Sequence, residues 1–285
     1  MIFISTGGYR WRTAFETSLE YLNNGILGIE LSGGKYSESF KSDLLSISGK
    51  TNLRVHNYFP PPEVPFVLNL ASNDPAVSKK SIDHVIQGIK LSASLKSPVY
   101  SFHAGFRMNP KADDLGNRLG IYQLTERERA LEIFGGNVSD LAEIARIEGV
   151  ELLIENNVVN ATNYKIYNED PFLLTGPIEI DNFMSQAPNN VGLLLDVAHL
   201  KVSAKTLDFN LTEAHHFLYR WIRGYHLSDN DGNADSNQII TSDSWFWKTL
   251  KLGLDYYSLE IYNVAIENLL QQSNLLASQI FSTDN

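Results

Sequence analysis

Eight short apolar runs, most of them followed by a stretch with helical periodicity, constrain the fold of this chain more than any other feature. Their residues are nearly all apolar rather than alternating, which is typical of strands buried on both faces of a parallel sheet. The runs are Ile2–Ser5, Ile26–Leu31, Leu53–His56, Val99–His103, Val150–Glu155, Val191–Asp196, Ile222–His226 and Tyr256–Glu260. We therefore expect eight parallel strands.

Helical patterns, with apolar residues three and four positions apart, lie between these runs. They cover Thr13–Asn23, 38–47, Ser78–Leu95, Thr125–Glu148, 178–186, Leu211–Trp221, 242–252 and Asn263–Leu276. Strand followed by helix, repeated over 285 residues, predicts an α/β fold of the (β/α)8 TIM barrel type, with residues 1–285 as a single domain. A doubly wound sheet is the alternative, but the turn after its first strand, Thr6-Gly7-Gly8-Tyr9, lacks the Gly-rich phosphate-binding pattern.

Two long connections leave the carboxyl ends of strands, where barrel enzymes place their sites. Residues 104–120 follow the fourth strand, and residues 156–173 follow the fifth. We expect both to be loops, either carrying part of a site or forming ordinary surface insertions.

The residues that end the strands are the clearest sign of chemistry. In a closed barrel these ends converge on one mouth, where carboxylates and imidazoles repel one another or stay unpaired unless a cation lies among them. The residues are Glu30, His56, His103, Glu155, Asp196, His226 and Glu260, with His199 three positions after Asp196. For Glu155, Asp196, His226 and Glu260 the joint occurrence favours a role as metal ligands. Such an oxygen and nitrogen set suits Mn²⁺, Mg²⁺, Co²⁺, Fe²⁺ or Zn²⁺.

Other candidates stay open from the sequence. His56 and His103 bind a second metal, contact substrate, or only fill the barrel mouth, and Glu30 belongs either to the site or to the structure. Tyr9 follows the first strand directly and is a candidate for the substrate pocket. The histidines predicted on helices are assigned to structure: His84, His215 and His216.

Composition removes several classes of function. The chain has no cysteine, which excludes disulfides, thiol nucleophiles and Cys-ligated metals. With 23 Lys and Arg against 33 Asp and Glu, a net charge of −10 argues against a nucleic acid partner. No basic region precedes the first apolar residues, and no run approaches the ~20 apolar residues of a membrane span. We expect a cytoplasmic protein without a membrane partner; association into homo-oligomers stays an open alternative.

Four segments carry a resemblance to a known family: LLIENN (152–157), LLLDVAH (193–199), GYHLSDNDG (224–232) and SLEIYN (258–263). Together they resemble the xylose isomerase-like superfamily of barrels, which includes sugar isomerases, ketose 3-epimerases, inosose dehydratases and endonuclease IV. The resemblance runs over nearly the whole chain through its strand ends. It implies a metal-dependent enzyme that acts on a small sugar or polyol derivative.

The resemblance also implies roles for individual residues. The epimerases hold one divalent metal through the residues that match Glu155, Asp196, His226 and Glu260, and their two glutamates exchange protons with the substrate. Glu155 and Glu260 are therefore the expected acid–base pair, acting through a metal-stabilised enediolate. His199 is expected to contact substrate. His56, His103, Asn237 and Tyr9 complete the predicted substrate-binding residues.

Three alternatives accompany this interpretation as an isomerase or epimerase. A dehydratase would use the same proton abstraction with loss of water. A zinc-dependent phosphoesterase of the endonuclease IV type would use His56 and His103 as additional ligands, but the histidine expected for its third zinc is replaced by Asn237. A binding protein without chemistry is the least favoured, because both glutamates are present.

Overall fold

Eight parallel strands pair in sequence order and close on themselves through β1 and β8 in this computed structural model, which describes residues 1–114 and 118–281. The predicted (β/α)8 barrel is thus confirmed as a single α/β barrel domain. The strands are β1 (Ile2–Ser5), β2 (Gly28–Leu31), β3 (Asn52–His56), β4 (Val99–His103), β5 (Glu151–Glu155), β6 (Val191–Asp196), β7 (Ile222–Leu227) and β8 (Tyr257–Leu259). Each expected apolar run forms the strand predicted for it, to within two residues at either end.

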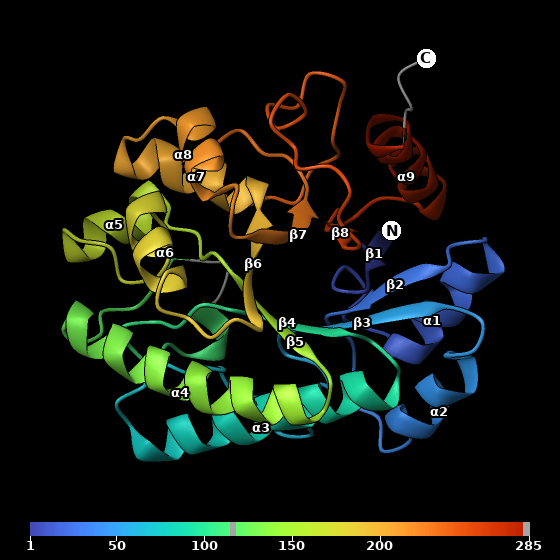
Figure 1. Ribbon diagram of the computed structural model, residues 1–285, viewed down its shortest axis with the longest axis horizontal. Helices are drawn as coiled ribbons and strands as arrows, with labels where there is room; N and C mark the ends of the chain where they lie inside the picture. Colours follow the sequence, from blue (N-terminus) through green and yellow to red (C-terminus); the bar gives the residue numbers. More distant parts are fainter. Residues whose placement is uncertain (115–117, 282–285) are drawn as a thin grey trace.

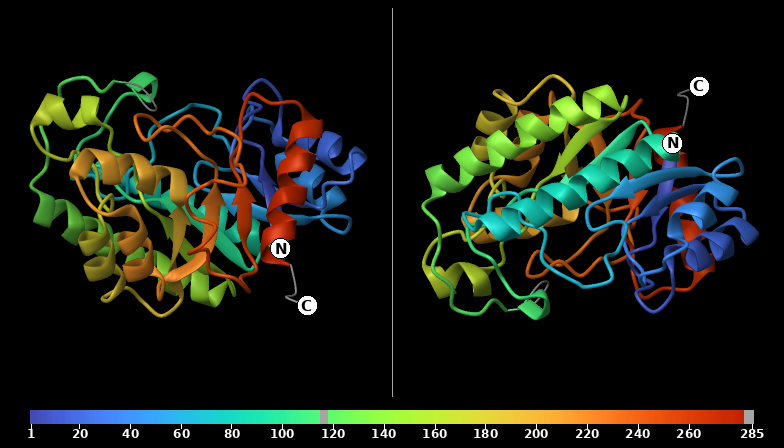
Figure 2. Two further views of the ribbon diagram at one scale, coloured as in Figure 1. Left: turned by 90° about the horizontal axis from the view of Figure 1, so that it is seen from above. Right: turned by 90° about the horizontal axis from the view of Figure 1, so that it is seen from below.

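The helices surround the barrel on the outside (Figures 1 and 2). Two long ones, α3 and α4, pack side by side along one flank. Within the described residues the helices are α1 (Ala14–Asn23), α2 (Phe40–Ile47), α3 (Pro75–Ser94), the 3₁₀ turn η1 (Ala112–Asp114), α4 (Arg127–Ile147), α5 (Ala161–Tyr167), α6 (Pro177–Met184), α7 (Val197–Leu207), α8 (Leu211–Leu218) and α9 (Ile266–Ile280). None of them is long and apolar enough to cross a membrane.

The helix expected over residues 242–252 is wrong, because this segment forms consecutive turns. Here a hydroxyl side chain bonds to the backbone, in place of the backbone-to-backbone hydrogen bonds of a helix. Ser244 Oγ accepts from the Thr241 amide and donates to Asp229 Oδ2 at 2.7 Å. Such local side-chain bonds favour turns over helix.

Two helices were not expected from the sequence. α5 lies inside the 156–173 connection, and Asn160 caps it by accepting a bond from the Asn163 amide at 2.9 Å. α7 begins directly after β6 without a connecting loop, because the last strand residue, Asp196, is also the helix N-cap. The 104–120 connection contains η1, and residues 115–117 of it lie outside the described part of the chain.

The interior of the barrel is filled by alternate strand residues, since successive side chains point to opposite faces. An apolar plug of Phe3, Leu153, Leu194 and Tyr256 lies there as a cluster of its own. Gly224 makes room for it: a Cβ at this position would lie 2.9 Å from Cδ1 of Tyr256. The strand ends above the plug are therefore the place where polar side chains gather.

Candidate functional site

The strand-end residues predicted from the sequence converge at one end of the barrel. Strand register places His103 beside Glu155 and Asp196 beside His226 on neighbouring strands. Glu155, Asp196 and His226 are fully buried, and Glu260 is 7% exposed. The barrel therefore brings together, from four strands, the residues proposed as metal ligands.

Glu155 lies at the centre of four imidazoles. Its Oε2 is 3.3 Å from His56 Nε2, 3.3 Å from His226 Nδ1 and 3.6 Å from His103 Nδ1. Its Oε1 is 3.3 Å from His199 Nδ1. The side chain of His103 is 29% exposed, so the cluster is open to solvent on that side.

The start of α7 positions Asp196 and His199. Asp196 Oδ1 accepts the His199 amide at 2.7 Å as the helix cap, which leaves Oδ2 buried without a hydrogen-bond partner. His199 Nδ1 lies 2.8 Å from the carbonyl oxygen of Asn156, and its Nε2 lies 3.2 Å from Asp235 Oδ2. A three-residue spacing on one helical turn thus sets the His199 ring next to the Asp196 carboxylate.

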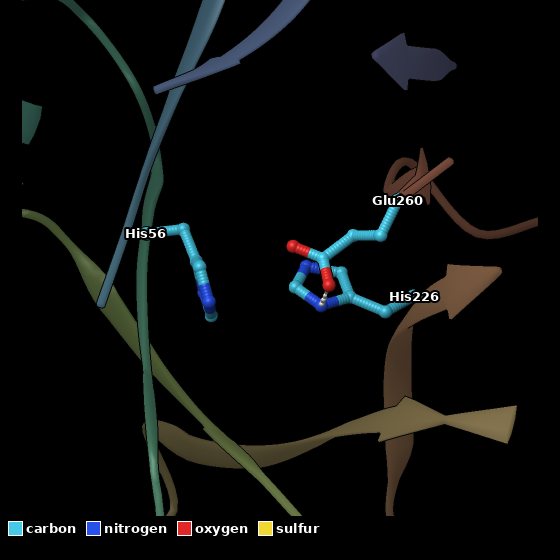
Figure 3. A group of neighbouring side chains, drawn as sticks. All are labelled: His56, His226 and Glu260. Atoms are coloured by element: carbon cyan, nitrogen blue, oxygen red, sulfur yellow. Dashed lines mark ion pairs between the residues drawn. The ribbon is translucent and has the colours of Figure 1, made fainter. Parts of the chain in front are cut away.

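Glu260 approaches the cluster from β8. Figure 3 shows its carboxylate beside the His226 ring, with His56 reaching from β3 toward both. Glu260 Oε2 is 3.5 Å from His226 Nδ1, while Oε1 accepts hydrogen bonds from Ser5 Oγ at 3.4 Å and Tyr262 OH at 3.3 Å. Ser5 and Tyr262 were not singled out in the sequence, although both are at inward-facing positions of the chain.

Glu30, left open by the sequence, belongs to the same buried network. Its Oε2 lies 2.9 Å from Nε2 of His226, on the opposite side of the imidazole from Glu155 and Glu260. Tyr256 OH donates to the same oxygen at 2.5 Å. Sequence reasoning missed Tyr256, which directly precedes β8 and extends its hydroxyl from an otherwise apolar ring into this network.

Burial and neighbouring charges shift the acidities in opposite directions. Burial opposes ionisation of Glu155, but the imidazoles of His103 and His226 hold its pKa well below the usual range. Burial raises the pKa of Glu260 to about 8, and the Glu155 carboxylate adds to this rise. Burial also raises the pKa of Asp196 to about 6. Burial among the other carboxylates therefore leaves Glu260 mostly protonated at neutral pH, while Glu155 and Asp196 stay ionised.

The donor set fits a divalent cation. One ligand atom from each of Glu155, Asp196, His226 and Glu260 lies within 4.8 Å of the others. Both Glu155 oxygens, Asp196 Oδ2 and His226 Nδ1 are buried without a hydrogen-bond partner. Leaving such groups unpaired is costly, and a cation among them would satisfy them together.

A second set of donors shares Glu155 with the first. Ligand atoms of His56, His103 and Glu155 also lie within 4.8 Å of one another, as do those of His56, His226 and Glu260. The structure thus leaves room for the additional metal that the sequence kept open at His56 and His103.

The remaining predicted residues lie outside the contacts of this cluster. The Tyr9 ring packs against Tyr21 and Trp11, with centroids 5.9 and 5.6 Å away. Asn237 is half-buried, and its carbonyl accepts the amide of Tyr262. Asp235, two positions earlier, is the residue of that loop that reaches His199. The proposed substrate contacts of Tyr9 and Asn237 stay predictions.

The helical histidines are located as expected. His84 is buried on α3 with its ring stacked on Tyr58, and His215 on α8 bonds Tyr225 OH at 2.9 Å. His216 follows it on the same helix, in the last turn. His84 and His215 are buried in helix packing, His216 is exposed, and none of the three is among the strand-end residues.

Solved structures of similar architecture include several epimerases. A D-tagatose 3-epimerase-like protein matches with a TM-score of 0.73 and 17% identity, covering 98% of this chain and 97% of that chain. L-Ribulose 3-epimerase matches at 0.66 and 16%, covering 96% and 86%. A protein from Thermus thermophilus soaked with ZnCl2 matches at 0.62 and 20%, covering 95% and 98%. At such identities the likeness establishes the fold alone.

No curated protein matches the sequence. The model of the family described as "Xylose isomerase-like TIM barrel" matches residues 23–268, which is most of the chain. The resemblance seen in the four strand-end segments is thereby confirmed: this chain belongs to the xylose isomerase-like TIM barrel family.

Proposed function

We propose that this protein is a divalent-metal-dependent enzyme that isomerises or epimerises a small sugar or polyol derivative. The observation that carries the proposal is the presence of two glutamates, Glu155 and Glu260, in one buried donor set with Asp196 and His226. Membership of the xylose isomerase-like family and the likeness to epimerase structures support it.

Glu155 ends β5 and Glu260 directly follows β8, and these two strands lie three apart around the barrel. A substrate carbon held between them would therefore meet a carboxylate on each of two sides. One carboxylate would remove a proton from the carbon next to a carbonyl, and the other would return it. A divalent ion, when bound, would supply Lewis acidity that makes this carbon-bound proton easier to remove.

His199 would orient the substrate. Its amide and Nδ1 are held by Asp196 and Asn156, and its Nε2 faces Asp235, a residue that is partly exposed. This arrangement would hold a substrate hydroxyl between an imidazole and a carboxylate. His103, the more open histidine, would offer a further contact on the solvent side.

The proposed function is tested by measuring the exchange of a carbon-bound substrate proton with solvent. Purified untagged protein would be analysed for metal, and then incubated in D₂O with a ketose panel that includes D-tagatose and L-ribulose. We expect one divalent ion per chain and deuterium incorporation at a carbon next to the carbonyl, with an epimer or isomer as the product. Loss of water from the substrate would indicate the dehydratase instead.

Three variants and one control make the assignment specific. Glu155→Gln and Glu260→Gln should each abolish exchange while the fold is kept, and Asp196→Ala should lower the metal content. His84→Ala, remote from the strand ends, should retain exchange. Normal exchange in either glutamine variant would remove that glutamate from the mechanism.

A second candidate function, a zinc-dependent phosphoesterase, is favoured by one observation: the donor set of His56, His103 and Glu155. Two adjacent metals sharing a carboxylate are the arrangement used in many phosphodiester hydrolyses. Two or three zinc ions per chain, with cleavage of a phosphodiester, would establish this function in place of the first.

A further inference from the structure

The Nε2 side of the buried His226 ring contacts the carboxylate of Glu30, which is not among the proposed metal ligands. Glu30 is fully buried in β2, and its Oε2 lies 2.9 Å from Nε2 of His226. Tyr256 OH donates to the same Glu30 oxygen. The Nε2 edge of the His226 ring is therefore already occupied.

The other edge of the ring faces the cluster. His226 Nδ1 is 3.3 Å from Glu155 Oε2 and 3.5 Å from Glu260 Oε2, and it has no hydrogen-bond partner of its own. A histidine can ligate a metal only through a nitrogen that carries a lone pair, so the partner of its other nitrogen decides which atom is offered.

We propose that Glu30, supported by Tyr256, is a positioning residue that keeps the proton of His226 on Nε2 and presents Nδ1 to the metal. The inference rests on the proposed function, since it assigns a role toward the metal of that site. Glu30 itself contacts no substrate in this scheme, because the His226 ring separates it from Glu155 and Glu260.

The same network continues to a second histidine. Tyr256 OH lies 3.3 Å from Ser101 Oγ, which in turn lies 3.0 Å from His56 Nδ1. This contact leaves Nε2 of His56 as the nitrogen that faces Glu155, at 3.3 Å. One chain of hydrogen bonds beneath the cluster thus orients two histidines, which stand with their rings 4.6 Å apart.

The packing of the Tyr256 ring holds these hydrogen-bonded residues in place. The Tyr256 ring meets Phe3 edge to face at 5.4 Å and His226 at 6.3 Å. Gly224 leaves room for the ring, and the guanidinium of Arg54 lies 5.9 Å from its centroid. A buried ion pair is a poor source of stability by itself. Its position behind a candidate ligand, in a packed layer, is what a positioning role requires.

The first readout is metal affinity. Mn²⁺ binding to chelator-treated protein would be measured by calorimetry for the wild type, Glu30→Gln and Tyr256→Phe. We expect Glu30→Gln to weaken binding by roughly 10- to 100-fold, the usual effect of losing such a partner, and Tyr256→Phe to weaken it less. Asp170→Asn is the matched control, a buried carboxylate bonded to Thr175 outside the barrel interior, and should bind as the wild type does.

The second readout needs no metal. In chelator-treated protein labelled with [¹⁵N]histidine, His226 Nε2–H should give a slowly exchanging proton signal downfield of the amides. It should be absent in His226→Gln and shifted in Glu30→Gln. Tyr256→Phe keeps the ring that fills the barrel, so it tests the network even if a Glu30 variant fails to fold.

The two readouts separate this inference from the proposed function. If the wild type binds no metal but the His226 signal is present and responds to Glu30→Gln, the proposed function is refuted, and of the positioning role only the part that fixes the proton on Nε2 stands. A metal affinity unchanged by Glu30→Gln, or a His226 signal insensitive to it, would overturn the positioning role.

Discussion

Replacing Glu260 by glutamine should stabilise the metal-free protein, although it removes a proposed ligand and catalytic residue. The carboxyl is buried beside the carboxylates of Glu155, Glu30 and Asp196, and burial raises its pKa to about 8 from a usual value near 4.5. The folded protein therefore keeps a proton there that the unfolded chain releases. Between these two pKa values the folded state binds more protons, so its stability falls as pH rises.

The size of this change in stability follows from the interval between the pKa values of the unfolded and folded states. Each pH unit above 4.5 lowers the free energy of unfolding of the metal-free wild type by about 1.4 kcal/mol, which amounts to about 3 kcal/mol at pH 7. Glutamine has no charge to bury, so metal-free Glu260→Gln should be more stable than the wild type by an amount of this order near pH 7. The difference should shrink toward zero as the pH falls through 4.5, because Glu260 then becomes protonated in the unfolded chain as well.

Metal should offset most of the difference in stability between the two proteins. An ion present at about 100 times its dissociation constant adds about 2.7 kcal/mol to the free energy of unfolding of the wild type, and much less to a variant that has lost a ligand. Urea unfolding at pH 4.5 and 7, with chelator or with Mn²⁺, would measure all of these values. Glu267→Gln, an exposed change on α9, is the control. Equal stabilities of the chelated proteins at pH 7 would refute the reasoning.

Two further changes test the packing described above. Gly224→Ala should destabilise the protein by about 1–3 kcal/mol in urea unfolding, because its Cβ would lie 2.9 Å from Tyr256; Gly136→Ala, with open space around it, should be neutral or stabilising, and equal losses would contradict this account. Burial lowers the pKa of His84 to about 4. The unfolded chain takes up that proton below about pH 6.5, so the wild type should lose about 2 kcal/mol through this group between pH 7 and 5. His84→Phe should remove that part of the loss, and an unchanged pH dependence would exclude His84 as its source.

The strands and the proposed ligands were accessible to sequence reasoning for a physical reason. A strand buried on both faces must be apolar, so a polar residue at its end stands out, as Glu155 and Asp196 do. Closure of the barrel then places all strand ends at one mouth whatever the exact angles. The convergence of Glu155, Asp196, His226 and Glu260 needs no more than this.

The prediction of helices from the sequence failed where local hydrogen bonding outweighed the spacing of apolar residues. Residues 242–252 have spacing compatible with a helix, yet Ser244 bonds Asp229 and caps a turn instead. α7 was not predicted because no polar loop separates it from β6. Asp196 is both the last residue of β6 and the N-cap of α7. A residue that ends one element and caps the next gives no boundary signal in a single sequence.

The network beneath the site shows where sequence reasoning stops. Alternation along a strand identifies the inward face, so Ser101, two positions before His103, could have been placed inside the barrel. Its bond to His56 follows from neighbouring strands, since the two residues are register partners. The bond between Glu30 and His226 joins β2 to β7 across the barrel, between residues 196 positions apart. Which inward side chains meet across that space depends on their lengths and on the size of Gly224, and these are properties of the packed interior rather than of any one strand.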